Sequence, residues 1–163
     1  MDPFMDLIID KLDRIILTQL QRNARLSLEA LADACGLSSA SVQRRVKRLR
    51  EANIIENEVA VLSPSALGQH MTFIVMVELE RERIDQLDAF RRIVRKEVQV
   101  QQCYYVTGEA DFTLICTARD MLDFEALTRR LFFENTNVRR FRTSVVMERT
   151  KVGLTIATQE NIS

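Results

Sequence analysis

The strongest chemical signal in the sequence is a basic segment in its N-terminal third. Five basic residues fall within seven positions: Arg44, Arg45, Lys47, Arg48 and Arg50. Arginine can bind guanine O6 and N7 together, glutamine can bind adenine N6 and N7, and serine can bind a base or a phosphate. Serine and glutamine side chains precede the basic residues, so the segment has the donors that read DNA. The alternative interpretation is a solvated helix face.

Helical spacing separates this segment into two faces. Val42, Val46 and Leu49 lie within about 60° of one another on a helix, with most of the basic residues opposite them. The first turns of a recognition helix point at base edges, and later basic residues contact phosphates. The residues expected to contact DNA are Ser39, Ser41, Gln43, Arg44, Lys47 and Arg48. Arg45 lies nearer the apolar stripe, where we expect it to pair with an acidic neighbour.

A second candidate site is the turn Thr107-Gly108-x-x-Asp111. Loop amides could hold a carboxylate while Asp111 receives an ammonium group, which are the two charges of a free α-amino acid. A structural role explains the same residues, since glycine supplies a positive φ and aspartate can bond the loop backbone. The spacing by itself leaves both interpretations open.

Residues for other chemistry are scarce. His70 is the single histidine, and the cysteines Cys35, Cys103 and Cys116 have no Cys-x-x-Cys spacing. These residues make a zinc site improbable, and we find neither a Ser-His-Asp set nor a phosphate-binding glycine loop. The sequence therefore predicts no enzyme, no metal and no cofactor. No secretory signal or membrane-spanning apolar run is found, so we expect a cytoplasmic protein with reduced cysteines.

Charge is balanced over the whole chain but not along it. The 163 residues contain 23 basic and 23 acidic side chains. Residues 35–53 carry five basic side chains against Glu51, a local excess of +4. A neutral total argues against indiscriminate coating of DNA, which depends on positive charge. A length of 163 residues allows one domain or two small ones.

The N-terminal region is predicted to contain three helices. Apolar spacing indicates a first helix at about 8–21, a second after Ser27 that ends at Gly36, and a third that begins at Ser38 or Ser39 and ends near Asn53. This order is the helix-turn-helix plan. Residues 55–62 alternate apolar and polar for most of their length and indicate a wing strand or hairpin.

The remainder of the chain has a different pattern. Strands are expected at 71–79, 98–106, 112–117 and 138–146, and helices at about 84–94 and 121–133. The order β-α-β-β-α-β is typical of a ferredoxin-like sandwich. We therefore predict an α+β protein with a winged helix-turn-helix domain at 5–62, a linker at 63–70, a ferredoxin-like βαββαβ domain at 71–152 and a C-terminal tail at 153–163.

Several short motifs resemble the Lrp/AsnC (feast/famine) family of transcriptional regulators over about residues 10–157. The matching motifs are Leu12-Asp13, Asn23-Ala24-Arg25, Gly36-Leu37-Ser38, Arg45-Val46-Lys47-Arg48-Leu49, Tyr105 to Phe112, and Thr143 to Met147. The sequence departs from the family at Asn53, where a glycine is usual, and at Glu56-Asn57-Glu58, where the wing usually begins with glycine and an aromatic residue. An acidic wing is repelled by phosphate, so we expect no contribution from it to DNA affinity.

The resemblance implies an amino-acid effector bound at contacts between dimers. Its binding residues would be Tyr105, Thr107, Gly108, Asp111, Thr143 and Ser144. The side chains near these positions are mostly apolar or hydroxyl, which favours leucine or methionine. The family also implies homodimers that assemble into octamers. A symmetric dimer predicts a double-stranded DNA operator that is an imperfect palindrome.

Two other function classes remain to be compared with an amino-acid-responsive regulator. One is an architectural DNA-binding protein of low sequence specificity. The other is an amino-acid-binding regulatory subunit of an enzyme, since βαββαβ domains occur in many proteins. The neutral total charge argues against the first alternative, and the lack of a catalytic set, a phosphate-binding loop and a metal cluster argues against the second.

Overall fold

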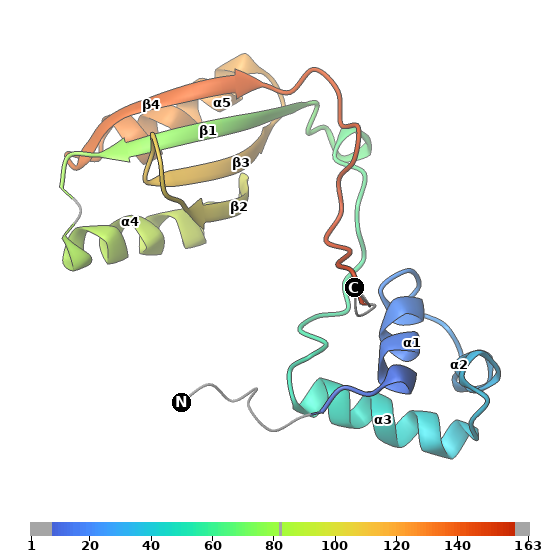
Figure 1. Ribbon diagram of the computed structural model, residues 1–163. Helices are drawn as coiled ribbons and strands as arrows, with labels where there is room; N and C mark the ends of the chain where they lie inside the picture. Colours follow the sequence, from blue (N-terminus) through green and yellow to red (C-terminus); the bar gives the residue numbers. More distant parts are fainter. Residues whose placement is uncertain (1–7, 82, 159–163) are drawn as a thin grey trace. The chain divides into compact units, whose positions relative to one another are not determined.

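The computed structural model describes residues 8–81 and 83–158, which form two compact units (Figure 1). The helical unit contains residues 8–61 and, from the end of the chain, residues 152–158. The sheet unit contains residues 62–151. The chain therefore leaves the helical unit, builds the sheet unit and then returns. Within the described ranges, no helix is long and apolar enough to cross a membrane.

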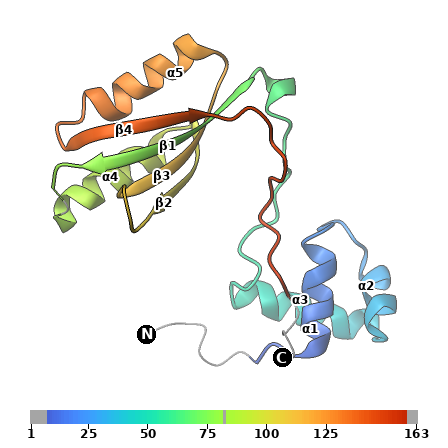
Figure 2. The same ribbon diagram turned by 45° about the horizontal axis from the view of Figure 1, so that its top comes forward.

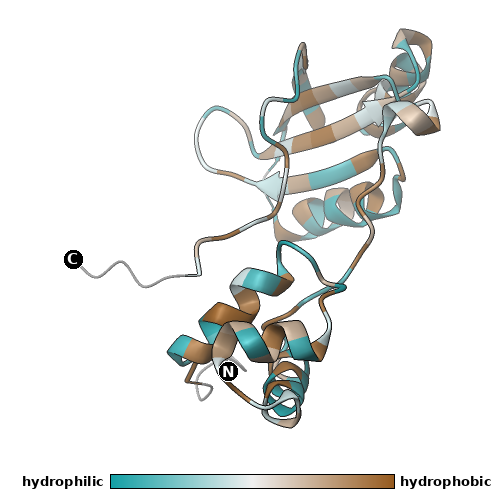
Figure 3. Ribbon diagram, turned by 90° about the vertical axis from the view of Figure 1, so that its right-hand side faces the viewer, coloured by the Kyte–Doolittle hydropathy of each residue, from teal (hydrophilic) through white to brown (hydrophobic). Residues whose placement is uncertain are grey.

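The helical unit contains the three helices predicted from the sequence: α1 (Lys11–Leu20), α2 (Leu28–Cys35) and α3 (Ser39–Glu51). Each helix begins at a residue whose side chain accepts a hydrogen bond from a first-turn amide, namely Asp10, Ser27 and Ser38. Their apolar faces, which Figure 3 distinguishes from the polar ones by colour, form one core. This core contains Ile16, Leu20, Leu31, Ala32, Val42, Val46 and Leu49.

Two left-handed residues end the second and third helices. Gly36 has φ 64° and caps α2, which directs the chain into the turn before α3. Asn53 has φ 55° just after α3. Asparagine tolerates this conformation better than most residues, which explains how it replaces the usual glycine there.

The segment from Ile55 to Leu62 does not form the expected wing strand or hairpin. The side chains of Val59 and Val61 are 75% and 93% exposed. These two apolar residues of the alternating pattern are therefore not buried against the rest of the protein. A strand requires a neighbouring strand for its backbone hydrogen bonds, and the described part of this chain supplies none at this position. The winged part of the fold prediction is therefore not formed in the single chain.

The sheet unit is an antiparallel sheet with strand order β2-β3-β1-β4 (Figure 2). The strands are β1 (Met71–Leu79), β2 (Val100–Tyr105), β3 (Phe112–Ala118) and β4 (Val138–Val145). Helix α4 (Ile84–Lys96) connects β1 to β2, and α5 (Met121–Thr128) with a π-helical turn (Arg129–Phe133) connects β3 to β4. The predicted βαββαβ order is confirmed, with the last residues of the expected 121–133 helix in the wider π-helical form.

The alternation of buried and more exposed side chains along β1 explains why the core lies on one face of the sheet. Phe73, Val75, Val77 and Leu79 are buried beneath the helices, while the residues between them face the open side of the sheet. Phe73 stacks on Phe124 of α5 with ring centroids 3.7 Å apart. Burial of such a side chain contributes on the order of 2 kcal/mol to folding. The strand ends and the β2–β3 loop are thereby held on a rigid scaffold.

Candidate DNA-binding and ligand-binding sites

The exposed side of α3 carries three of the residues expected to contact DNA. Gln43, Arg44 and Lys47 are exposed, while the opposite face of the helix is buried at Val42 and Val46. Within the described residues, the Arg44 guanidinium has no ion-pair or hydrogen-bond partner. Because this cation has no internal partner, no ion pair or hydrogen bond must break when it binds a base or a phosphate. This side of α3 therefore exposes polar and cationic side chains, and Arg44 among them has no internal partner within the described residues.

Lys47 has only a weak competing partner. Its Nζ lies 3.7 Å from Oε1 of Glu51, one turn further along α3, and both side chains are more than half exposed. An exposed pair of this kind contributes a few tenths of a kcal/mol at most. A phosphate can therefore displace Glu51 at little cost. Ser39 and Ser41, in the first turn of α3, are half-buried.

The other side of α3 is joined to α1 by a buried carboxylate. Asp13 is 0% exposed and accepts hydrogen bonds from the Asp10 amide (3.1 Å) and from Nη1 of Arg45 (2.8 Å). Nη1 of Arg45 also lies 2.7 Å from Oδ2 of Asp10. The expected pairing of Arg45 with an acidic neighbour is confirmed. These contacts lower the pKa of the Asp10 carboxyl, first through the Asp13 amide and then through Arg45.

Arg48 shares the same carboxylate. Its Nη2 donates to Oδ2 of Asp13, and its Nε is buried without a hydrogen-bond partner among the described atoms. The side chain is 41% exposed, so contact with a ligand is possible. Asp13 nevertheless compensates much of its charge, whereas Arg44 has no such partner among the described residues. Sequence spacing alone does not reveal this pairing, because Asp13 lies 35 residues earlier.

The last turn of α3 is joined to the segment that follows it. Nη2 of Arg50 lies 2.8 Å and 3.0 Å from the two carboxylate oxygens of Glu58. This geometry compensates one of the two acidic side chains that the sequence places in the expected wing. Arg50 and Arg45, the two basic residues of the segment that were not expected to contact DNA, thus both have acidic partners.

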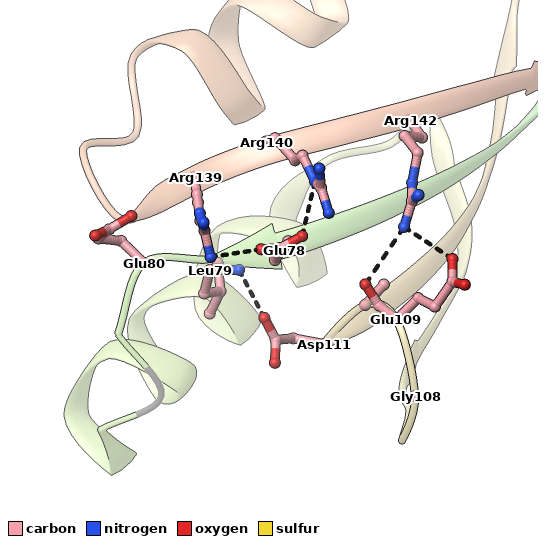
Figure 4. Close-up of a pocket in the computed structure, with 10 residues that line it drawn as sticks. Glu78, Leu79, Glu80, Gly108, Glu109, Asp111, Arg139, Arg140 and Arg142 are labelled. Carbon is pink, nitrogen blue, oxygen red and sulfur yellow. Dashed lines mark hydrogen bonds and ion pairs between the residues drawn. The ribbon is translucent and has the colours of Figure 1, made fainter.

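The sheet unit has an open pocket of 540 Å³ beside the β2–β3 loop (Figure 4). It is formed by three parts of the fold: the loop, the end of β1 and the start of β4. The lining residues are Glu78, Leu79, Glu80, Gly108, Glu109, Ala110, Asp111, Arg139, Arg140 and Arg142. Most of these side chains are charged. The expectation of a mostly apolar or hydroxyl neighbourhood around the loop is therefore wrong for this pocket.

The pocket arginines are held by glutamates from other segments. Arg139 and Arg140 lie 2.9 Å and 2.8 Å from the two carboxylate oxygens of Glu78, and Arg142 lies 3.2 Å from Oε2 of Glu109. Such a mixture of guanidinium and carboxylate groups can bind both a carboxylate and an ammonium group. The arginines were missed from the sequence. The antiparallel register that pairs Arg140 with Glu78 and Arg142 with Met76 could have indicated them.

Asp111 has a structural contact in addition to its place in the pocket. Its Oδ2 accepts a hydrogen bond of 2.6 Å from the Leu79 amide, which joins the loop to the end of β1 (Figure 4). Gly108 has φ 115°, a conformation that favours glycine. Both features support the structural interpretation of the turn. They do not remove the Asp111 carboxylate from the pocket lining.

The other four expected effector residues do not line this pocket. The centroids of the Tyr105 and Phe112 rings lie 5.2 Å apart. The guanidinium carbon of Arg91 lies 5.3 Å from the centroid of the Tyr105 ring. Thr107 is exposed in the loop. Thr143 and Ser144 are exposed on β4, where they pair with Val75 and Ile74 of β1. Of the six residues, the structure brings only Gly108 and Asp111 together in the pocket.

Known proteins resemble the chain over both units. The AsnC-type helix-turn-helix domain matches residues 9–50, and the Lrp/AsnC ligand binding domain matches residues 72–156. An uncharacterised HTH-type transcriptional regulator of Sinorhizobium fredii is 50% identical over 143 residues, which cover 88% of this chain and 85% of that protein. The leucine-responsive regulatory protein of Escherichia coli is 32% identical over 143 residues, which cover 88% and 87%.

A solved structure matches both units as well. A transcriptional regulator of Neisseria meningitidis, in complex with L-methionine, has a TM-score of 0.86 and 29% sequence identity to this chain. The match covers 92% of this chain and 97% of that one. The two kinds of comparison agree on the order of the two units along the chain.

Proposed function

Since this chain belongs to the Lrp/AsnC family of transcriptional regulators, we propose that it binds an imperfectly palindromic operator through α3 and responds to free methionine or leucine. It is a helix-turn-helix transcriptional regulator with a ligand-binding domain, and its relatives are regulators, not enzymes. The proposal adds the operator symmetry, the contact residues and the effector.

The single observation that carries the DNA-binding part is the division of α3 into two faces. One face is fixed by core packing and by Asp13, and the other exposes Arg44 with Gln43 and Lys47 beside it. A helix held in this way can enter a major groove without loss of its own packing. We expect Arg44 and Gln43 to contact base edges, and Lys47 to contact a phosphate.

The effector part rests on the pocket and on two similar proteins. The charged groups of the pocket suit the carboxylate and ammonium groups that every free amino acid carries. A regulator of similar structure was solved with L-methionine, and a 32% identical relative is named for its response to leucine. The pocket of one chain offers little apolar surface for their side chains. We therefore propose that a second dimer covers the side chain, which places the effector at an oligomer contact.

The oligomeric part of the proposal uses the exposed apolar residues of the sheet unit. Ile74, Tyr104 and Val145 are 38%, 50% and 45% exposed, and Met147, just after β4, is 94% exposed. Exposed apolar groups of this kind favour association of chains. We propose homodimers that assemble into octamers, as the family resemblance implies. Effector binding can then alter DNA affinity by favouring one assembly over another.

A thermal-shift panel of the twenty amino acids tests the effector. A ligand that binds only the folded state raises the melting temperature, and at a hundred times its dissociation constant it adds about 2.7 kcal/mol of stability. We expect methionine or leucine to give the largest shift. Equal shifts from all twenty, or none, would contradict the proposed effector.

The DNA part is tested by selecting bound fragments from a pool of genomic DNA and measuring their affinity against salt. We expect a defined symmetric site whose affinity falls steeply as salt rises, because several phosphates are neutralised. Binding that depends only on fragment length would instead support an architectural role.

A further inference from the structure

The last described residues of the chain, 152–158, belong to the helical unit, and we call them the C-terminal strap; Ile156 and Thr158 of the strap contact α1 and its C-cap, Gln21. The Gln21 side-chain amide makes two hydrogen bonds with the main chain of Ile156. Nε2 donates to the Ile156 carbonyl oxygen (3.0 Å), and Oε1 accepts from the Ile156 amide (3.2 Å). Gln21 thus satisfies the strap backbone at this residue as a neighbouring strand would.

A second group of contacts lies nearer the start of α1. The Thr18 hydroxyl contacts the Thr158 hydroxyl, and Nη1 of Arg14 donates to the Thr158 carbonyl oxygen (3.0 Å). Arg14, Thr18 and Gln21 fall within about 60° of one another at 100° per residue. The core residues of α1 lie on a different side of the helix. The strap therefore occupies a polar face that the core does not use.

The strap and the linker leave the sheet unit from neighbouring strands. Residues 62–70 lead into β1 at Met71, and residues 146–151 lead from β4 to the strap. Phe73 of β1 pairs with Val145 of β4, and the Val146 amide donates to the Thr72 carbonyl oxygen (2.9 Å). The two connections between the units thus begin side by side on one pair of strands. A shift of this pair of strands would therefore move the start of both connections.

The strap is a second connection between the two units, in addition to the linker, and it limits how freely they can reorient. One flexible linker leaves two domains free to reorient, whereas an intramolecular docking contact acts at an effective concentration in the millimolar range. Within residues 152–158, the docking buries little apolar surface, because Val152, Leu154 and Ile156 are 62%, 80% and 72% exposed. The described contacts between the strap and α1 are therefore mainly hydrogen bonds.

We propose that the C-terminal strap docks on α1 of its own chain and couples effector binding in the sheet unit to the placement of α3. The coupling role rests on the proposed effector response, whereas the docking itself does not. Because α1 is joined to α3 through Asp13, a strap that restrains α1 also restrains the DNA-binding helix. An effector that moves the β1–β4 pair would change the fraction of chains in which the strap is docked.

Hydrogen exchange tests the docking. The Ile156 amide should be protected in the full chain, and Gln21→Ala should make it exchange at least about tenfold faster, since 1.4 kcal/mol of lost stabilisation corresponds to a factor of ten. Gln19→Ala is the matched control, because it removes the same kind of side chain from the last turn of α1, where no contact with the strap is found among the described residues. Full-chain exchange of Ile156 at the rate of an unstructured peptide would overturn the docking.

Operator titrations with and without L-methionine or L-leucine test the coupling. We expect one of them to change the operator affinity of the full chain by 5- to 150-fold, the usual range for coupled sites, and that of Gln21→Ala and of a chain ending at Lys151 by less than about twofold. Calorimetry should show that both variants still bind the effector, with an affinity that differs from that of the full chain because coupling is reciprocal. An unchanged response in both variants would overturn the coupling. A full chain that responds to neither amino acid would overturn the effector assignment and the coupling, while the exchange data still decide the docking.

Discussion

The carboxylate of Asp13 on α1 accepts a hydrogen bond of 2.8 Å from the guanidinium of Arg45 on α3. Asp13 is completely buried, and Arg45 retains only 23% of its side-chain exposure. The pair therefore joins the first helix to the DNA-binding helix in a partly dehydrated environment. The neighbouring residue Arg44 has no such partner among the described residues, so only one of these two adjacent arginines is neutralised within the described part of the chain.

Removal of the Asp13 charge should destabilise the helical unit. The loss of one partner from a buried ion pair costs about 3–5 kcal/mol, and the exposure of Arg45 and Arg48 reduces this to about 2–3 kcal/mol for Asp13→Asn. Urea unfolding measures the change. Asp33→Asn, at an exposed position on α2, is the control and should lie within about 0.5 kcal/mol of the native chain. Equal stability of the two variants would show that the pair is not structural.

Arg44→Ala should weaken operator binding without loss of stability. If Arg44 contacts a base, its loss costs about 1–3 kcal/mol, which is at least a fivefold rise in the dissociation constant. Fluorescence anisotropy with labelled operator DNA measures it. Arg92→Ala, an exposed arginine on α4, removes the same charge from the sheet unit and should leave affinity nearly unchanged. A similar loss in both variants would point to general electrostatic attraction.

Asp111→Asn separates the two roles of this residue. An asparagine oxygen can still accept the hydrogen bond from the Leu79 amide, which is 2.6 Å long in the native chain, but the side chain no longer carries a charge. We expect the melting temperature without ligand to change little and the shift produced by methionine to disappear. Asp85→Asn on α4 is the control. A full methionine shift in Asp111→Asn would leave Asp111 with its structural role only.

The contribution of Asp10 to stability should depend on pH. The pKa of its carboxyl is lowered by the Asp13 amide and by Arg45. Because the folded pKa lies below the unfolded value of about 3.9, the stabilisation is complete well above pH 4 and is lost as pH falls through the folded value. Asp10→Asn should therefore be less stable than the native chain at pH 7, and the difference should shrink below about pH 4. Urea unfolding from pH 7 to pH 3 measures it, and a constant difference would contradict the assignment.

The thiol of Cys116 should be unreactive in the folded protein. Burial raises its pKa to about 12, so about one molecule in ten thousand carries the thiolate at pH 8. We expect iodoacetamide at pH 8 to modify the partly exposed Cys35 well before Cys116, as measured by peptide mass spectrometry. In 6 M guanidinium chloride the two should react alike. Rapid native modification of Cys116 would show that β3 opens readily.

Local patterns determined most of the fold. The three N-terminal helices follow from apolar spacing and from caps at Ser27 and Ser38, and the Gly36 turn follows from the need for a positive φ. The βαββαβ order follows from the change in period after the linker. These features depend on interactions between residues a few positions apart, so they can be predicted from the sequence alone. The wing strand was not formed because a strand also depends on a partner, which alternation alone does not supply.

Only the tertiary structure decided which charged side chains lack an internal partner and are available to bind a ligand. Asp13 and Arg48 are 35 positions apart, and Glu78 and Arg140 are 62 apart, so neither pair shows as a local pattern. Spacing placed Arg44, Lys47 and Arg48 together on the side of the helix expected to contact DNA, whereas packing of α1 against α3 gives only Arg48 of the three a buried acidic partner. Likewise, strand register gathered the pocket arginines, and the return of the chain placed Ile156 on Gln21. The sequence by itself determined which positions carry a charge. The fold decided which of these charges are neutralised, because the electrostatic effect of a charged group depends on the partners and the solvent that surround it in space.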